Sequence, residues 1–267
     1  MSDVTTLLDA AHAAVSADPE NEALRLRFFE RLVDGEMVLL LEREAMGESL
    51  EPRIFDLEDG PVVLVFDREE RLASFTGGIA PYAALPGRVI AGLLKGQGIG
   101  MGVNLGVAPS SMLLPPEAMD WLAQTLDSGP EAVEARPQEF LAPMVPEALI
   151  AALDGKLARA SGLAAAAVLA GVVYAGGRRG HLLAVLDAVE GAEAALARAM
   201  NEALVFSGID AGELDVVFLA GGDPAAIAMA RVGLRFDLPA PQTPATPATP
   251  AAPAAPGMDP SRPPKLR

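Results

Sequence analysis

The sequence predicts an α+β protein with two domains: an N-terminal mixed sheet flanked by helices and a C-terminal ferredoxin-like β-α-β-β-α-β domain, followed by a disordered Pro/Ala tail. Three observations lead to this expectation. The 267 residues suit two domains of ordinary size. Helical and strand periods both occur in each half, and Thr-Pro-Ala repeats begin after Pro239. We therefore expect the domains at 1–128 and 136–238, and the tail at 239–267.

The N-terminal domain is expected to begin with two helices. Apolar residues recur at the helical period over 7–15 and again over 24–32. Between these stretches, Asp18 can accept from free helical N–H groups and Pro19 suits a first helical turn. Later helices in this domain are expected in three places: from 67, over 85–94 and from 115.

Strands in the same domain are expected at 37–41, 53–57, 61–66 and 99–105. The run 61–66 is apolar almost throughout, which is typical of a central strand buried on both faces. The dipeptide Asp59-Gly60 just before it is a strong hairpin signal. Apolar residues make up 51% of the chain and aromatic residues only 4%, so Ala, Leu and Val must build the cores.

The second half alternates strand and helix signals in a recognisable order. Its expected strands are 132–141, 163–174, 181–186 and 214–219, with a further one at 228–236. Its expected helices are 146–160 and 190–206. The order β-α-β-β-α-β is that of the split βαβ, or ferredoxin-like, fold. Many unrelated functions use this fold, so it names none.

Charge and cysteine content bound the partners. The chain carries 20 Lys and Arg against 36 Asp and Glu, a formal net charge of −16. So acidic a surface repels phosphate backbones and anionic lipids, so we expect no nucleic acid and no membrane partner. Solubility alone accounts for the charge, and the alternative is that it attracts a cation or a protein partner with a basic face. The absence of cysteine excludes disulfides and thiolate sites and suits the cytoplasm. The start lacks a basic n-region, which predicts no signal peptide.

The glycine-rich run 96–102 invites a nucleotide-binding interpretation, but its spacing does not fit one. No glycine follows Gly98 or Gly100 at the third position, as G-x-G-x-x-G requires, and a Gly-Lys-Ser/Thr sequence is missing. Glycine at every second position leaves one strand face bare. Gly98, Gly100 and Gly102 are therefore expected to allow close packing, with approach of a ligand as the alternative.

The sequence gives little support for a nucleophilic catalytic site or a metal site. His12 and His181 are the two histidines, and nothing in their spacing brings carboxylates to them. A serine triad would need Ser110 or Ser111, which no G-x-S-x-G elbow surrounds. We expect no catalytic, cofactor-binding or metal-binding residues.

Two charged pairs stand out in the remaining sequence. Glu69 and Glu70 point apart on a helix and have arginines beside them, so a solvated capping turn is expected there. Arg178 and Arg179 make a basic spot at a hairpin tip on an acidic chain. A solvated turn accounts for them, and a contact with a partner is the alternative.

Several stretches are similar to a known family. They are Arg27–Leu32 with Met37–Leu40, Pro61–Glu70, and Gly102–Gly106 with Leu114–Met119, followed in the second half by a helix ending near Leu157 and by Glu213–Phe218. Together they resemble the SseB family, of the enhanced serine sensitivity protein B type, over about 7–219. Leu105 stands after Asn104 where the family usually has proline. The resemblance implies no catalytic residues.

These observations favour a non-catalytic protein-interaction or regulatory module without a cofactor. The alternative is a small-molecule sensor, for an amino acid, in the ferredoxin-like half, which the serine phenotype of the resembling family motivates. An unrecognised hydrolase is the third and least favoured interpretation. A deep pocket with convergent polar groups would favour a sensor or an enzyme, and an exposed apolar patch an interaction module. The weak candidate surface or loop positions are Gly98, Gly100, Gly102, Asn104, Arg178 and Arg179. The oligomeric state stays open.

Overall fold

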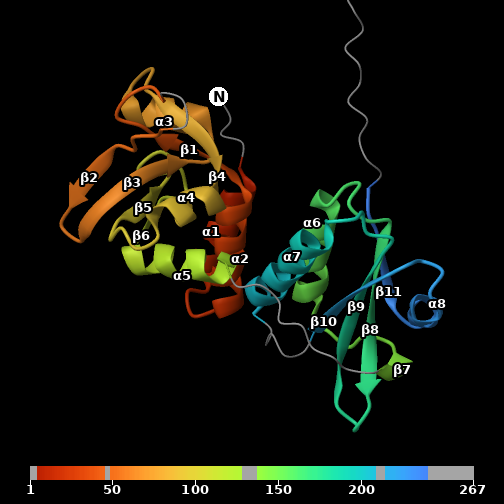
Figure 1. Cartoon of the computed structure of the whole chain (residues 1–267). Helices are drawn as coiled ribbons and strands as arrows, with labels where there is room; N and C mark the ends of the chain where they lie inside the picture. The colour runs from red at the N-terminus through yellow and green to blue at the C-terminus, as the bar shows by residue number, and fades with distance from the viewer. Residues whose placement is uncertain (1–4, 46–48, 128–136, 209–213, 240–267) are drawn as a thin grey trace, which may run out of the picture.

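The computed structural model describes residues 5–45, 49–127, 137–208 and 214–239. Over these ranges the chain forms two sheets with helices packed on them, which confirms the α+β class (Figure 1). The expected joint between the domains, around 128–136, and the expected tail after Pro239 lie outside the described residues.

The N-terminal sheet contains the strands β1 to β6. The elements are α1 (Leu7–Ala17), α2 (Glu22–Asp34), β1 (Glu36–Leu40), β2 (Ile54–Leu57), β3 (Gly60–Phe66), α3 (Glu69–Thr76), β4 (Tyr82–Pro86), α4 (Gly87–Leu94), β5 (Gly100–Val103), β6 (Met112–Leu114) and α5 (Pro116–Asp127). The strand order is β4-β1-β3-β5-β6, with β2 also paired to β3. Only β3 and β5 run parallel, so the sheet is mixed, as expected.

Strand β3 lies in the centre, as its apolar run predicted. Val63 and Val65 face a core shared with α1, α2, α4 and α5, whereas Val62 and Leu64 face a smaller cluster that includes Leu72 of α3. Four helices thus cover one face of this sheet, and α3 covers part of the other. Figure 1 shows α3 on the side of the sheet opposite α5.

Two strands and one cap differ from the sequence expectations. The patterns did not predict β4 and β6, because both are short, lie at the ends of the strand order and lack a long apolar run. The cap of α2 is Asn21, whose side chain accepts from the amide of Leu24, rather than Asp18. Asp18 instead accepts from the side-chain amide of Asn21 at 3.1 Å, so it supports the cap indirectly.

The C-terminal sheet contains the strands β7 to β11. The elements are β7 (Pro137–Leu141), α6 (Glu147–Arg159), β8 (Ala166–Tyr174), β9 (Arg179–Leu186), α7 (Glu193–Phe206), β10 (Leu214–Leu219), α8 (Pro224–Ala230) and β11 (Leu234–Asp237). Helices α6 and α7 cover one face and α8 the other, so β8 is buried on both sides.

The predicted order β-α-β-β-α-β is present from β7 to β10, but the sheet order differs from a ferredoxin-like sheet. The strands run β10-β9-β8, and β7 and β11 both pair with the outer edge of β8. A split βαβ leaves room for a strand between its two parallel strands. Here β9 and β10 are direct parallel neighbours, because β7 pairs with β8 and does not enter between them.

The segment expected as a last strand, 228–236, is divided between a helix and a strand. Asp223 accepts from the amide of Ala225 and caps α8, and Pro224 occupies the first turn. Strand β11 then pairs antiparallel with the start of β8. The sequence rule for proline at a helix start applies here, but the helix of seven residues is too short to show a clear helical period.

The two halves meet through helices. α7 contacts α2 and α5, and Phe206 near the end of α7 belongs to the core of the N-terminal sheet. The Phe206 ring lies 6.4 Å from that of Trp121, which in turn lies 5.3 Å from Phe29. The contact between the halves therefore has an aromatic centre, beside which charged side chains gather.

Candidate functional site

A surface hollow lies between α3 and β4 on the open side of the N-terminal sheet. Its volume is about 290 Å³. The residues that line it come from α3, from the loop after it and from the start of β4: Glu69, Glu70, Leu72, Ala73, Gly78, Ile79, Ala80 and Tyr82. Ile79 is completely exposed beside this hollow.

Other large apolar side chains continue this surface. Phe75 is 38% exposed and contacts the rings of Phe55 and Phe66 at 6.3 and 5.4 Å. Leu57 follows Phe55 by two residues on β2, so both side chains point to the same side of the sheet. We call the exposed residues Leu57, Phe75, Ile79 and Tyr82 the apolar face. Such a face is typical of a contact surface rather than of an ordinary surface position.

Acidic side chains lie beside the apolar face. Glu69 and Glu70 line the hollow, and Glu44 is close enough to Tyr82 to raise the pKa of its hydroxyl. Glu58 and Asp59 are exposed in the turn directly after Leu57. A hydrogen bond to Glu69 raises the pKa of the Tyr82 hydroxyl. Two nearby arginines, Arg43 and Arg53, are paired with glutamates of the same region. The rim of the hollow therefore favours binding of a positively charged group.

A buried ionic network holds the N-terminal end of α3 in place. Arg71 donates to both carboxylate oxygens of Asp9, at 3.0 and 2.5 Å, and also to Asp67 at 2.7 Å. Ser110 donates to Asp9 at 2.5 Å, and Asn104 donates to Ser110 at 2.9 Å. Three segments that are distant in the sequence are thereby tied together beneath α3: the start of α1, the start of α3 and the loop after β5.

The electrostatics of this network match a structural role. Burial raises the pKa of Asp9, but hydrogen bonds from Arg71 and Ser110 outweigh it and hold that pKa far below its usual value. Ser110 and Asn104 are fully buried. The Ser110 hydroxyl is within reach of a carboxylate, yet no substrate can reach it without opening the fold. The hydrogen bonds of Ser110 therefore stabilise the position of α3 and do not prepare the hydroxyl for nucleophilic attack.

A second ionic cluster joins the two halves of the molecule. Asp34 at the end of α2 contacts Arg88, Lys156 and Arg159 at 2.5 to 2.9 Å. Glu202 of α7 contacts Arg88 at 3.0 Å and Lys156 at 2.9 Å. Burial raises the pKa of Asp34, but the nearby cations, Lys156 above all, lower it below its usual value. Helices α2, α4, α6 and α7 are linked through these five side chains.

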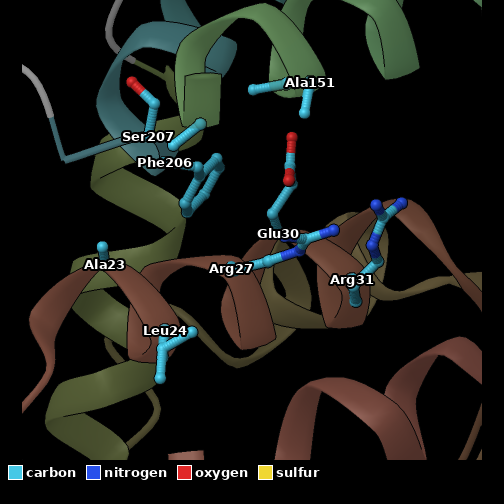
Figure 2. Close-up of a pocket in the computed structure, with 10 residues that line it drawn as sticks. Ala23, Leu24, Arg27, Glu30, Arg31, Ala151, Phe206 and Ser207 are labelled. Carbon is cyan, nitrogen blue, oxygen red and sulfur yellow. The ribbon is translucent and has the colours of Figure 1, made fainter. Parts of the chain in front are cut away.

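Beside this cluster, Glu30 points into a small hollow of about 90 Å³ between the halves (Figure 2). Its carboxylate is directed from α2 toward Ala151 of α6, with Phe206 on one side. The residue is 7% exposed. Burial raises the pKa of this carboxyl group, and Lys156 offsets only part of the effect.

The glycines of the predicted candidate positions have different roles. A Cβ on Gly100 would lie 2.5 Å from the carbonyl oxygen of Leu114, and one on Gly102 would lie 2.6 Å from side-chain atoms of Leu64 and Leu105. Both glycines therefore permit close packing. Gly98 faces open space but has a φ of +65°, so the turn conformation explains it and packing does not.

The other candidate positions are spread over the molecule. Asn104 has a φ of +48° and is fully buried in the network under α3, so it is not a surface position. Arg178 stacks over Tyr174 at 4.1 Å and pairs with Asp215 at 3.0 Å in the C-terminal sheet, and Arg179 is exposed beside it. The structure does not bring these candidates together in one site.

The histidines also lie apart. His12 packs edge-on against Phe28 at 6.0 Å, and His181 accepts from the amide of Met144 at 3.3 Å. Among the described residues, no three His, Cys, Asp or Glu side chains converge as a metal site would require. No helix within the described ranges is both long and apolar enough to cross a bilayer.

Sequence reasoning missed Glu30 and the ionic cluster between the halves. Glu30 lies among the charged residues of α2, which read as a solvated helix face. Lys156 offered a signal, because it continues the apolar stripe of Leu149 and Leu153 on α6. A cation on an apolar stripe indicates a buried partner of opposite charge.

The chain was compared with protein families, with curated proteins and with solved structures. No family model matches the chain, and no curated protein or solved structure shows significant similarity to it.

Proposed function

We propose that the chain is a non-catalytic protein-interaction module of the SseB type. The apolar face binds a protein segment that inserts an apolar side chain into the hollow between α3 and β4. Lysines or arginines on either side of that anchor meet the acidic rim. The partner thus has a basic, partly apolar contact segment.

The observation that carries the proposal is the complete exposure of Ile79 at the hollow. Burying a side chain of this size contributes about 1.5–3 kcal/mol, which the free chain does not gain at this position. Phe75 and Tyr82 add further apolar area around it. Central apolar anchors of this kind dominate the energy of many protein interfaces.

The buried network under α3 supports the same role. Arg71, Asp9 and Asp67 fix the start of the helix whose residues line the hollow. A rigid contact surface loses less conformational freedom when its partner binds. The acidic rim speeds encounter with a basic segment, and this contribution weakens as salt rises.

The test is a pull-down with the full chain from the cells that produce it, at low and at high salt. Ile79→Asp places a charge at the anchor position and is expected to abolish recovery of the partner. Ile227→Asp on α8, where the native side chain is 47% exposed, is the matched control and should leave recovery intact. Equal recovery with both variants would contradict the proposal.

A further inference from the structure

Glu30 is a largely buried residue whose carboxylate faces the hollow between the halves. It is more than nine-tenths buried, and it forms no hydrogen bond or ion pair with any other residue in the described ranges. One helical turn away, Asp34 contacts three cations. The Glu30 carboxylate is therefore left to hydrogen-bond with water or with a ligand in the hollow, rather than with a side chain of the described residues.

The hollow in front of Glu30 is small and mixed in character. Its volume of about 90 Å³ is enough for several water molecules. Ala148, Ala151 and Ala152 of α6 form one wall, and Phe206 of α7 forms another. These walls offer the carbon atoms of a ligand an apolar surface.

Two guanidinium groups stand at the edge of the same hollow. Arg27 and Arg31 precede and follow Glu30 on α2, and both line the hollow. Neither forms an ion pair with another residue that the structure describes. In Figure 2 the Arg27 side chain runs past the base of the Glu30 side chain, and the Arg31 side chain rises to one side of it, both from the same helix. One anionic group and two cationic groups therefore border a space of a few atoms.

This combination of charges matches one class of small molecule. An ammonium group is the donor that a buried carboxylate lacks, and a carboxylate is the acceptor that guanidinium groups bind best. A molecule that carries both charges on neighbouring carbons is an α-amino acid. From this arrangement we propose that the hollow between α2, α6 and α7 binds an α-amino acid with a small side chain, of the size of glycine, alanine or serine.

In this complex, Glu30 accepts from the ammonium group, and Arg27 and Arg31 bind the carboxylate. The side chain of the amino acid faces the alanines of α6. Because the ligand touches α2 from one half and α6 and α7 from the other, it adds contacts between the halves. The site is independent of the apolar face, and its test does not depend on a protein partner.

The experiment is calorimetric titration of the full chain at pH 7.5 with glycine, L-alanine and L-serine, and thermal unfolding with the same ligands. We expect binding to the wild type with a Kd between about 10 μM and 1 mM, given so few contact atoms. Saturating ligand should raise Tm by about 2 °C or more. L-Phenylalanine should bind at least tenfold more weakly, because a hollow of about 90 Å³ is too small for its ring.

Three variants separate the site from general effects on folding. Glu30→Gln should weaken binding at least tenfold while the free protein keeps or raises its Tm, since a buried charge is removed. Ala151→Leu should block binding by filling the hollow without changing any charge. Glu22→Gln, an exposed position on the same helix, should bind as the wild type does.

Two half-ligands test the pairing of charges. Methylamine carries only the ammonium group and acetate only the carboxylate, so each should bind at least tenfold more weakly than glycine. If methylamine equals glycine, the role of the arginines is wrong and the site is one for simple amines. The proposal is overturned if none of the three amino acids binds, or if Glu30→Gln binds them as tightly as the wild type.

Discussion

The two ionic networks of this chain both pair buried carboxylates with cations, but they differ in how exposed those cations are. In the network under α3, Arg71 lies between Asp9 and Asp67, and all three side chains are less than a tenth exposed. In the cluster between the halves, Lys156 is equally buried, whereas Arg88 and Arg159 are 39% and 47% exposed. The first network is enclosed within one sheet domain, and the second reaches the solvent.

The two networks also differ in how much stability the loss of one cation should cost. Under α3 one cation contacts two acids, so its loss leaves two buried carboxylates without a cation, and only uncharged donors such as Ser110 remain. Between the halves, three cations serve Asp34 and Glu202, and each acid keeps a partner when one cation is lost. Glu30, next to this cluster, is influenced by its charges but is not in contact with them.

The largest expected effect comes from Arg71→Met, which breaks the enclosed network. Removing one partner of a buried ion pair typically costs about 3–5 kcal/mol, because the remaining charges stay desolvated. Chemical denaturation of the variant should show this loss. Arg25→Met on α2, whose native side chain is half exposed, is the control and should change Tm by about 1 °C or less. A loss below 1 kcal/mol for Arg71→Met would show that the network is not the support of α3.

A smaller loss is expected from Lys156→Met in the cluster between the halves. Arg88 remains in contact with both acids, so we expect about 1.5–3 kcal/mol, the usual value of charged hydrogen bonds. Denaturation with urea measures it. If Lys156→Met costs more than Arg71→Met, then the contact between the halves, and not the enclosed network, limits the stability of the chain.

A pH series distinguishes Glu30 from Asp9, because their pKa values move in opposite directions. Burial raises the pKa of Glu30 above 4.5, so the folded state is more stable while this carboxyl group is protonated. That extra stability is lost as the pH rises through the pKa of Glu30 in the folded state. Glu30→Gln should therefore raise Tm at pH 8, by about 2–4 °C per kcal/mol gained, and have no effect near pH 4.

Asp9 gives the opposite profile. Its pKa is held below 3.8, so its contribution is present at neutral pH and is lost as pH falls through the lowered folded value. Asp9→Asn should thus destabilise at pH 8, and the difference from the wild type should shrink only well below pH 4. Unfolding curves from pH 3 to pH 8 measure both variants. Parallel profiles for the two variants would contradict the assignment.

The smallest effect is expected from Arg159→Met. Its guanidinium group is half exposed and contacts Asp34, which keeps Lys156 and Arg88 as partners. Exposed ion pairs contribute about 0–1 kcal/mol, and salt screens them. We expect a loss at the low end of this range in dilute buffer that disappears in 0.5 M NaCl. A loss that persists at high salt would mean that Arg159 contributes mainly through packing.

Local patterns determined much of the secondary structure. The apolar run of β3 and the Asp59-Gly60 turn before it were readable because a buried strand needs continuous apolar residues and a tight turn needs glycine. The close packing at Gly100 and Gly102 was readable for a similar reason, since only glycine leaves a strand face bare. Each of these signals is contained within a few neighbouring residues.

Only the tertiary structure decided the strand order and the fate of the charged residues. β9 and β10 became neighbours because β7 pairs with β8, a choice between distant segments that no local pattern records. In the sequence, Glu30 lies near Arg27 and Arg31, as on a solvated helix face. In the folded chain, α6 and α7 from the other half bury it. Burial depends on what packs against a residue, so the hollow that Glu30 faces exists only in the folded chain.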